Sequence, residues 1–375
     1  MYISNPVQND GVIKFISYTL GGNDVQNQAT RRYSDFWALR AKLLERWPGV
    51  YIPNIPPKKV VGNLEKKNID KRIRLLNKFC LKLSKYPFIY SSDEVILFQS
   101  HGPDVGKALE KSPKVKYPEM LEQYKSAFPN YDESYDLILG KSKMVEFSGF
   151  LKKTLKNLHA FHEVVSACVE KRSQEIVQYI SLMHQMEEYE KYVLMEYSDN
   201  NESKLILFNP QNTALNEKVV AMQTSLRNPF VALEEWLEEE ELDIEAGIEA
   251  MDSLVRLSST VEKLNQKIES LENQLKKLQY GNQNPIAEFF KKKEEKMAEL
   301  ERNKTQTTED LEALSLINKM AHFNMEVFFE NFQKEKTKSY YKALKTYSLL
   351  HLENNKYNDD LWKEIKGSLN KVKEA

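Results

Sequence analysis

An uninterrupted heptad of apolar residues runs through the third quarter of the chain. Its members recur at alternating spacings of three and four residues, at Leu254, Leu257, Val261, Leu264, Ile268, Leu271, Leu275 and Leu278. This period is typical of an α-helix that packs against other helices in a coiled coil. The sequence therefore predicts an all-α region here.

The helical pattern around this heptad is long. From about Glu146 it is nearly continuous, with breaks at residues 199–229 and 280–285, where Asn, Gly and Pro gather. Three long antiparallel helices are predicted. At about 1.5 Å per residue, a helix over residues 229–280 would be roughly 75 Å long, which suits a projecting rod. The predicted coiled-coil or dimer core is Trp236, Leu257, Val261, Leu264, Ile268 and Leu271, and Leu237, Leu242 and Ile244 are further candidates for the dimer centre.

The N-terminal third has a different pattern. Residues 1–35 contain short alternating segments separated by Asn, Asp and Gly, which predict hairpin strands. Helical periodicity follows at residues 34–45 and 64–85, and Phe36, Trp37 and Leu39 are predicted to be core residues. We expect an α+β domain with a three-stranded antiparallel sheet and a helical layer.

Three basic motifs lie in this domain: residues 31–37 (RRYSDFW), the proline loop at residues 52–59 (IPNIPPKK), and residues 71–74 (KRIR). A guanidinium offers paired donors to a phosphate. A tyrosine offers a flat face to a sugar ring, and a stiff proline loop can hold a lysine at a fixed distance. Together these motifs predict a phosphoinositide pocket.

The three motifs in this order resemble the PX domain, and the whole chain resembles the PX-BAR sorting nexins. The resemblance implies that Arg32 binds the 3-phosphate of the lipid and that Tyr33 stacks under the inositol ring. It implies that Lys58 holds the 1-phosphate and that Arg72, seven residues before the aromatic Phe79, binds the 4- and 5-hydroxyls. Each of these side chains, taken alone, could instead be a solvated surface group. Lys59 could replace Lys58 or face the membrane.

The resemblance also implies a domain order. Residues 1–105 would form the PX domain, residues 106–140 an ordered connector with a short helix at 118–127, and residues 141–375 a BAR domain that dimerises into a crescent. Such a protein would bind phosphatidylinositol 3-phosphate on the cytosolic face of early endosomes, respond to membrane curvature, and act in endosomal protein sorting and transport. Its partners would be a second copy or another PX-BAR protein, with retromer or a similar coat as a further candidate. The alternative is a dimeric adaptor or tether whose PX domain binds a peptide or protein.

A second basic group is predicted at the turn between the last two long helices. Its residues are Lys276, Lys277, Phe289, Phe290, Lys291, Lys292 and Lys293. Membrane contact and a solvated face are both consistent with this pattern, because glutamates lie nearby. The acidic run at residues 238–241 is expected to stay in solvent or to face a basic partner, since consecutive helical residues point in different directions.

Charge and composition bound the remaining possibilities. Residues 1–105 hold 16 Lys and Arg and 9 Asp and Glu residues, so the end with the motifs is the basic end, as expected of a domain that meets an anionic membrane. No apolar run approaches the ~20 residues that cross a bilayer, and the first ten residues are too polar for a signal peptide. We expect a peripheral cytoplasmic protein.

No enzyme, cofactor or nucleic-acid partner is predicted. The chain has no glycine loop for phosphates, no nucleophile elbow and no recognisable Cys/His pair. His159 and His162 are spaced to share a helix face, but no third ligand follows, so no metal site is expected. Two distant cysteines do not form a disulfide framework.

Overall fold

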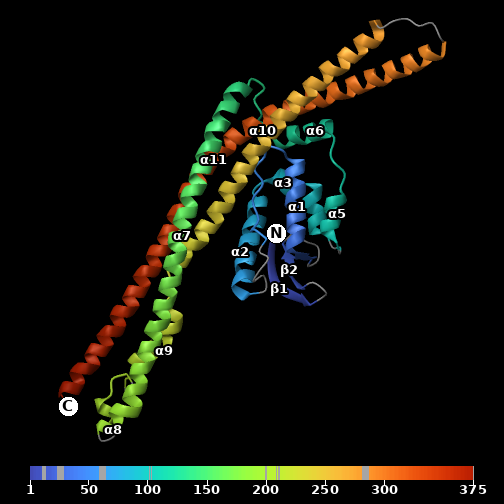
Figure 1. Ribbon diagram of the computed structural model, residues 1–375. Coiled ribbons are helices and arrows are strands. Elements are labelled where there is room, and N and C mark those ends of the chain that lie inside the picture. The colour runs from blue at the N-terminus through green and yellow to red at the C-terminus, as the bar shows by residue number, and fades with distance from the viewer. Residues whose placement is uncertain are drawn as a thin grey trace. The chain divides into compact units, whose positions relative to one another are not determined.

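The computed structural model describes residues 1–10, 14–22, 29–58, 65–100, 102, 104–198, 201–207, 209, 212–280 and 287–374 (Figure 1). The strands in these residues are β1 (Tyr2–Asp10), β2 (Lys14–Gly21) and β3 (Ala29–Arg32). The shorter helices of the first third are α1 (Tyr33–Arg46), α2 (Lys66–Leu83), α3 (Pro87–Tyr90), α4 (Asp93–Gln99), α5 (Val105–Lys111) and α6 (Tyr117–Ala127). The remaining helices are α7 (Leu137–Tyr189), the π-helix η1 (Glu190–Leu194), α8 (Met195–Tyr197), the 3-10 helix η2 (Glu202–Lys204), α9 (Thr213–Ser225), α10 (Phe230–Tyr280) and α11 (Ala287–Glu374).

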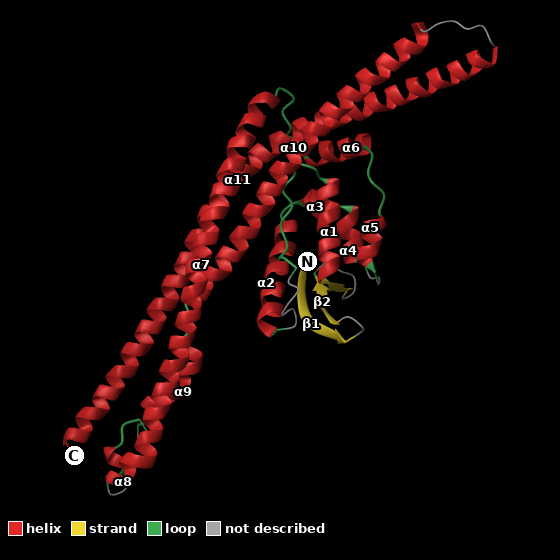
Figure 2. Cartoon of the chain, in the orientation of Figure 1, coloured by secondary structure: helices red, strands yellow, loops and turns green. Residues whose placement is uncertain are grey.

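The strands form an antiparallel sheet in the order β1-β2-β3 (Figure 2). Tyr18 of β2 pairs with Arg31 of β3, and the register of β1 shifts between Ser4 and Val7, where Asn5 has a positive φ of 46°. A residue inserted in this way bends a strand. The described residues thus confirm the predicted α+β fold, a three-stranded sheet with helices beside it, followed by a long helical region.

Helix α1 packs against α4 and α5 through one face. Phe36 and Leu39 are fully buried, as predicted, and the Phe36 ring lies edge-on to that of Phe98, with 4.9 Å between centroids. The prediction that Trp37 is a core residue is wrong, because its side chain is 56% exposed. Adjacent helical residues lie about 100° apart, and Trp37 falls on the side of α1 that faces away from the buried residues.

Helix α6 covers residues 118–127, where the sequence predicts a short helix. Tyr124 of α6 is buried, and its hydroxyl donates a hydrogen bond to the carbonyl oxygen of Pro48 at 2.6 Å. Its ring packs against that of Trp47, at a centroid distance of 5.3 Å. Beyond α6, Tyr131 and Tyr135 both lie edge-on to Phe323 of α11. The connector therefore contacts both the N-terminal domain and the long helices.

The chain divides into two compact units. The first comprises Met1–Leu155 and Glu241–Phe332, and the second comprises Lys156–Glu240 and Gln333–Ala375. In the first unit, α10 and α11 run antiparallel: Ser258 donates to Asn318 at 3.2 Å, and farther along α10 Glu272 pairs with Lys304 at 2.8 Å. The predicted heptad lies along α10. Leu257 and Leu271 are buried, and Val261, Leu264 and Ile268 are half-buried.

In the second unit, α7, α10 and α11 pack through aromatic and polar contacts. The Trp236 indole donates to the Ser339 hydroxyl at 3.0 Å and packs beside Phe161 and Tyr340. Leu237 is fully buried within the chain itself. The expectation that the acidic run at 238–241 stays in solvent or faces a partner protein is wrong for Glu240, which is 6% exposed and pairs with Lys336 of α11 at 2.9 Å.

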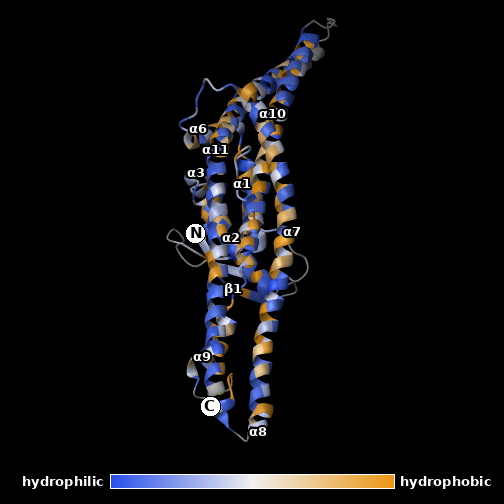
Figure 3. Ribbon diagram, turned by 90° about the vertical axis from the view of Figure 1, so that its left-hand side faces the viewer, coloured by the Kyte–Doolittle hydropathy of each residue, from blue (hydrophilic) through white to orange (hydrophobic). Residues whose placement is uncertain are grey.

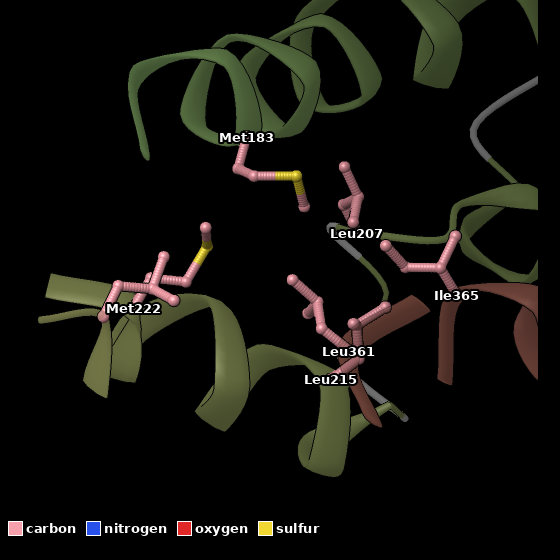
Figure 4. Packing of buried hydrophobic residues seen from close by; sticks show 7 residues of the cluster. Met183, Leu207, Leu215, Met222, Leu361 and Ile365 are labelled. Atoms are coloured by element: carbon pink, nitrogen blue, oxygen red, sulfur yellow. The ribbon is translucent and has the colours of Figure 1, made fainter. Parts of the chain in front are cut away.

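The first predicted helix break contains the additional helix α9. An apolar cluster holds α9 and the segment before it against α7 and α11 (Figure 4). Its buried members are Met183, Leu207, Leu215, Met222, Leu226, Leu361 and Ile365. Glu190, at the start of η1, accepts hydrogen bonds from the backbone N–H groups of Ile206 and Leu207 at 2.9 and 2.7 Å. Helix α7 also begins earlier than predicted, at Leu137.

In the first unit, the N-terminal domain packs directly on α10 and α11. The buried Tyr51 hydroxyl donates to Asp243 of α10 at 2.9 Å, and the Tyr51 ring stacks on Phe328 of α11 at 4.6 Å. The Gly49 N–H donates to the Ser253 hydroxyl at 3.0 Å. Gly49 has a φ of +80°, and a Cβ there would lie 2.5 Å from the Leu254 side chain, so both conformation and space require glycine.

The long helices are not uniformly apolar. In Figure 3, polar and apolar residues alternate along α7 and α10. Accordingly, within the part of the chain that the structure describes, no helix has a stretch long and apolar enough to cross a membrane.

Candidate functional site

The two adjacent arginines of the RRYSDFW motif have different environments. Arg31 points inward and is 2% exposed. Its guanidinium donates to the carbonyl oxygens of Phe98 at 2.8 Å and of Ser100, which joins β3 to the end of α4. The Arg32 side chain, in contrast, is 43% exposed. The alternation of a β-strand places neighbouring side chains on opposite faces, so Arg31 serves the core and Arg32 faces outward.

Asp35 holds Arg32 at the start of α1. The Arg32 N–H donates to one Asp35 carboxylate oxygen at 2.9 Å, and the other oxygen lies 3.5 Å from Arg32 Nε. A side-chain acceptor three residues into a helix satisfies a backbone N–H that the helix leaves open. The Arg32 guanidinium also lies over the Phe15 ring of β2, 5.9 Å from its centroid. Both contacts restrain an exposed side chain that would otherwise sample many rotamers.

Tyr33 joins the proline loop to α2. Its hydroxyl donates to the Pro56 carbonyl oxygen at 2.6 Å. The Arg72 guanidinium lies 5.1 Å from the centre of the Tyr33 ring, within the range of a cation–π contact. Arg72 itself is 8% exposed. Residues 39 positions apart in the sequence thus form one cluster with the proline loop.

The charge of Arg72 affects the hydroxyls around it. Burial raises the pKa of Tyr33, and the nearby guanidinium groups of Arg72 and Arg40 oppose this rise. Burial likewise raises the pKa of Tyr18 in β2, and again Arg72 opposes the rise through a hydrogen bond and its charge. Both tyrosines are therefore neutral at physiological pH, and the cluster keeps the positive charge that attracts an anion.

The proline loop places Lys58 two residues beyond the Pro56 carbonyl that Tyr33 holds. Lys58 is exposed. The sequence-predicted residues therefore divide into two groups: Arg32, Tyr33 and Arg72 are held in place by contacts, and Lys58 is fixed only through its loop. Lys59 lies outside the described residues.

The second basic group is described only in part. Lys276 and Lys277 are exposed near the end of α10. Phe289, Phe290 and Lys291–Lys293 fall in the first turns of α11, and their side chains lie outside what the structure describes. Among the described residues, no three His, Cys, Asp or Glu side chains are grouped to hold a metal ion.

Three neighbours of the site were not predicted as site residues: Phe15, Asp35 and Arg40. The Asp35 contact had a sequence signal, because an acidic residue three positions after a helix cap is typical of a capping box. No sequence signal indicated the contacts of Phe15 and Arg40. Their contacts depend on how β2, α1 and the proline loop pack in three dimensions.

Comparisons with known proteins agree with this fold. Residues 20–101 match the PX domain family. Sorting nexin-8 of Homo sapiens is 31% identical over 111 residues, which are 29% of this chain and 23% of that protein. Sorting nexin MVP1 of Candida glabrata is 42% identical over 69 residues, which are 18% of this chain and 14% of that protein. The matched segments therefore span less than a quarter of the length of these relatives.

A solved structure described as the SNX-BAR Mvp1 tetramer resembles the chain over nearly its whole length. The TM-score is 0.53 at 13% sequence identity, and the match covers 97% of this chain and 99% of that one. At this identity the likeness shows the fold. Together these comparisons show that the chain contains a PX domain at residues 20–101, that this part is similar to sorting nexins, and that the chain has the SNX-BAR fold.

Proposed function

We propose that the protein is a peripheral membrane protein that binds phosphatidylinositol 3-phosphate through its PX domain. The observation that carries this proposal is the convergence of the three basic motifs on Tyr33, whose hydroxyl holds the proline loop and whose ring supports Arg72. In this account Arg32 binds the 3-phosphate and Arg72 the 4- and 5-hydroxyls. Lys58 holds the 1-phosphate, and Tyr33 lies under the inositol ring.

The helical region would make membrane binding depend on curvature as well as on lipid identity. We propose that residues 1–105 act as the PX domain, residues 106–140 as the connector, and residues 141–375 as a BAR domain that forms a homodimer or pairs with another PX-BAR protein. Two lipid sites in one dimer bind with avidity, because the second site meets its lipid at a high effective concentration. Lys276 and Lys277, which are exposed, are candidates for contact with anionic lipid.

The resulting role is endosomal protein sorting without catalysis. The protein would act on the cytosolic face of early endosomes, where retromer or a similar coat is a candidate partner. Relatives named as sorting nexins support this assignment. The rival role, a dimeric adaptor or tether whose PX domain binds protein, predicts no dependence on lipid identity.

Co-sedimentation with vesicles of two diameters separates these roles. Vesicles contain either phosphatidylinositol 3-phosphate or enough phosphatidylserine to match its charge. We expect binding to require the phosphoinositide and to increase on the smaller vesicles. Binding that is equal on both lipids and both sizes would favour the adaptor and contradict the proposal.

A further inference from the structure

We propose that helix α10 positions the proline loop of the lipid site through the carboxylates of Glu245 and Glu249. Lipid affinity would then depend on the contact between the PX domain and the helical region. This inference rests on the proposed lipid binding and adds positioning residues that lie outside the PX domain. Both glutamates belong to the same compact unit as the proline loop.

Arg40 makes the first connection. Its side chain is 9% exposed and lies on α1, seven residues after Tyr33. Its Nε donates to the Pro53 carbonyl oxygen at 2.9 Å, and its Nη2 pairs with Glu249. A guanidinium is planar, so the carboxylate that holds one edge also orients the edge that faces Pro53. A buried charge without its partner is unfavourable, and Arg40 therefore needs Glu249 to stay in this position.

Asn54 makes the second connection. Its Nδ2 donates to Glu245 Oε2 at 3.0 Å, and its Oδ1 accepts from the Ile55 N–H at 2.9 Å. A carboxylate can only accept a hydrogen bond, so the Asn54 nitrogen must face Glu245. The Asn54 oxygen is then left to hold the backbone of the loop at Ile55.

These contacts reach the lipid site within a few residues. Pro53 and Asn54 receive the restraints from α10, and the Pro56 carbonyl two residues later accepts the Tyr33 hydroxyl. Arg40 also lies close enough to Tyr33 for its charge to oppose, together with that of Arg72, the rise in the Tyr33 pKa that burial causes. If the glutamates are removed, the loop keeps its buried apolar side chains and its hydrogen bond to Tyr33, but Arg40 and Asn54 lose the carboxylates that orient them. The position of Lys58 depends on the loop. Lys58 can then move relative to Arg32 and Arg72.

The positioning contacts are separate from those that dock the domain. Docking depends on Tyr51, which is fully buried and stacked on Phe328, and on Asp243, which accepts from both Tyr51 and Lys82. Burial, with the charge of Asp243 adding to it, raises the pKa of Tyr51 well above its usual value, so its hydroxyl remains a donor. Removing Glu245 or Glu249 leaves this docking intact.

The test is calorimetric titration of the full-length protein with short-chain, soluble phosphatidylinositol 3-phosphate. Glu249→Ala and Glu245→Ala are compared with Asp252→Ala, which removes the same charge from an exposed position of the same helix. We expect each of the first two variants to bind about 3- to 10-fold more weakly than wild type, which is the usual range for residues that act through a neighbour. Asp252→Ala should bind lipid and unfold as wild type does. Glu249→Ala leaves the buried Arg40 without its partner and should unfold at a lower temperature, so all titrations are made well below the unfolding temperature of every variant.

Hydrogen exchange on the unliganded protein provides a second measurement. Its result at Ile55 would not change if the two glutamates only stabilised the fold. The Ile55 amide should exchange several-fold faster in Glu245→Ala than in Asp252→Ala, and the Gly49 amide, which belongs to the docking contact, should not. Affinity and Ile55 exchange equal to those of Asp252→Ala would overturn the inference.

Arg32→Ala in the same titration separates the two proposals. If wild type binds and Arg32→Ala does not, lipid binding stands and the glutamate variants alone decide the positioning role. If wild type shows no binding, the proposed lipid site fails first, and the inference fails with it.

Discussion

Arg32→Ala is expected to weaken binding of soluble phosphatidylinositol 3-phosphate by at least about 100-fold. A charged arginine that donates two hydrogen bonds to a phosphate contributes about 1.5–3 kcal/mol for each bond, and about 1.4 kcal/mol corresponds to a tenfold change in affinity. The expected loss is therefore large for a single side chain. Arg32 is the more exposed of the motif's two arginines, and Asp35 and Phe15 already restrain it. Little side-chain entropy is therefore lost when it binds.

The substitution should leave the fold intact. The Arg32 side chain is 43% exposed, and removing it creates no cavity, so the unfolding temperature should remain close to that of wild type. Lys125→Ala, in which an exposed lysine of α6 loses the same charge, is the control and should bind lipid normally. An Arg32→Ala variant that folds and binds with wild-type affinity would show that the phosphate lies elsewhere.

Phe36→Ala is expected to lower the free energy of unfolding of its compact unit by about 3–5 kcal/mol. The loss combines the transfer of a buried ring to water with the cavity that the ring leaves. Phe36 is fully buried, and its ring lies edge-on to both Phe98 and Phe79, at centroid distances of 4.9 and 6.4 Å. Chemical denaturation followed by fluorescence or circular dichroism measures the change.

The adjacent aromatic residue provides a matched control. Trp37→Ala removes a larger side chain that is 56% exposed, and surface substitutions of this kind usually change stability by no more than about 0.5 kcal/mol. Circular dichroism suits this comparison because Trp37 is itself a fluorophore. Equal losses for Phe36→Ala and Trp37→Ala would mean that α1 is rotated relative to the packing described above.

The long helices were predictable because their signal is local and repeated. The heptad from Leu254 to Leu278 predicts the second half of α10. The flanking Pro229 and Gly281, which are read directly from the sequence, mark the two ends of the helix. Helix α9 was missed because the segment around it carries Asn and Pro, and few of its side chains are buried. Its stability comes from Leu215 and Met222 packing against α7 and α11, which are distant in sequence.

The site was predictable to the extent that its residues lie in short motifs. Arg32, Tyr33, Lys58 and Arg72 could be named because their motifs resemble those of the PX domain, and their roles remain predictions. The error at Trp37 came from extending the buried face of α1 by one residue, because Trp37 points about 100° away from Phe36 and into solvent. The α10 contacts could not be predicted, because Asn54 and Glu245 are 191 residues apart and no local pattern pairs a loop amide with a distant carboxylate.

Titration of the wild-type protein with soluble, short-chain phosphatidylinositol 3-phosphate, beside phosphatidylinositol that lacks the 3-phosphate, is the most direct measurement of the lipid site. The arrangement of Arg32, Tyr33 and Arg72 predicts saturable binding of the phosphorylated head group, one per chain, and none of the unphosphorylated one. Absence of binding to both lipids, in a protein that is folded by circular dichroism, would contradict the account.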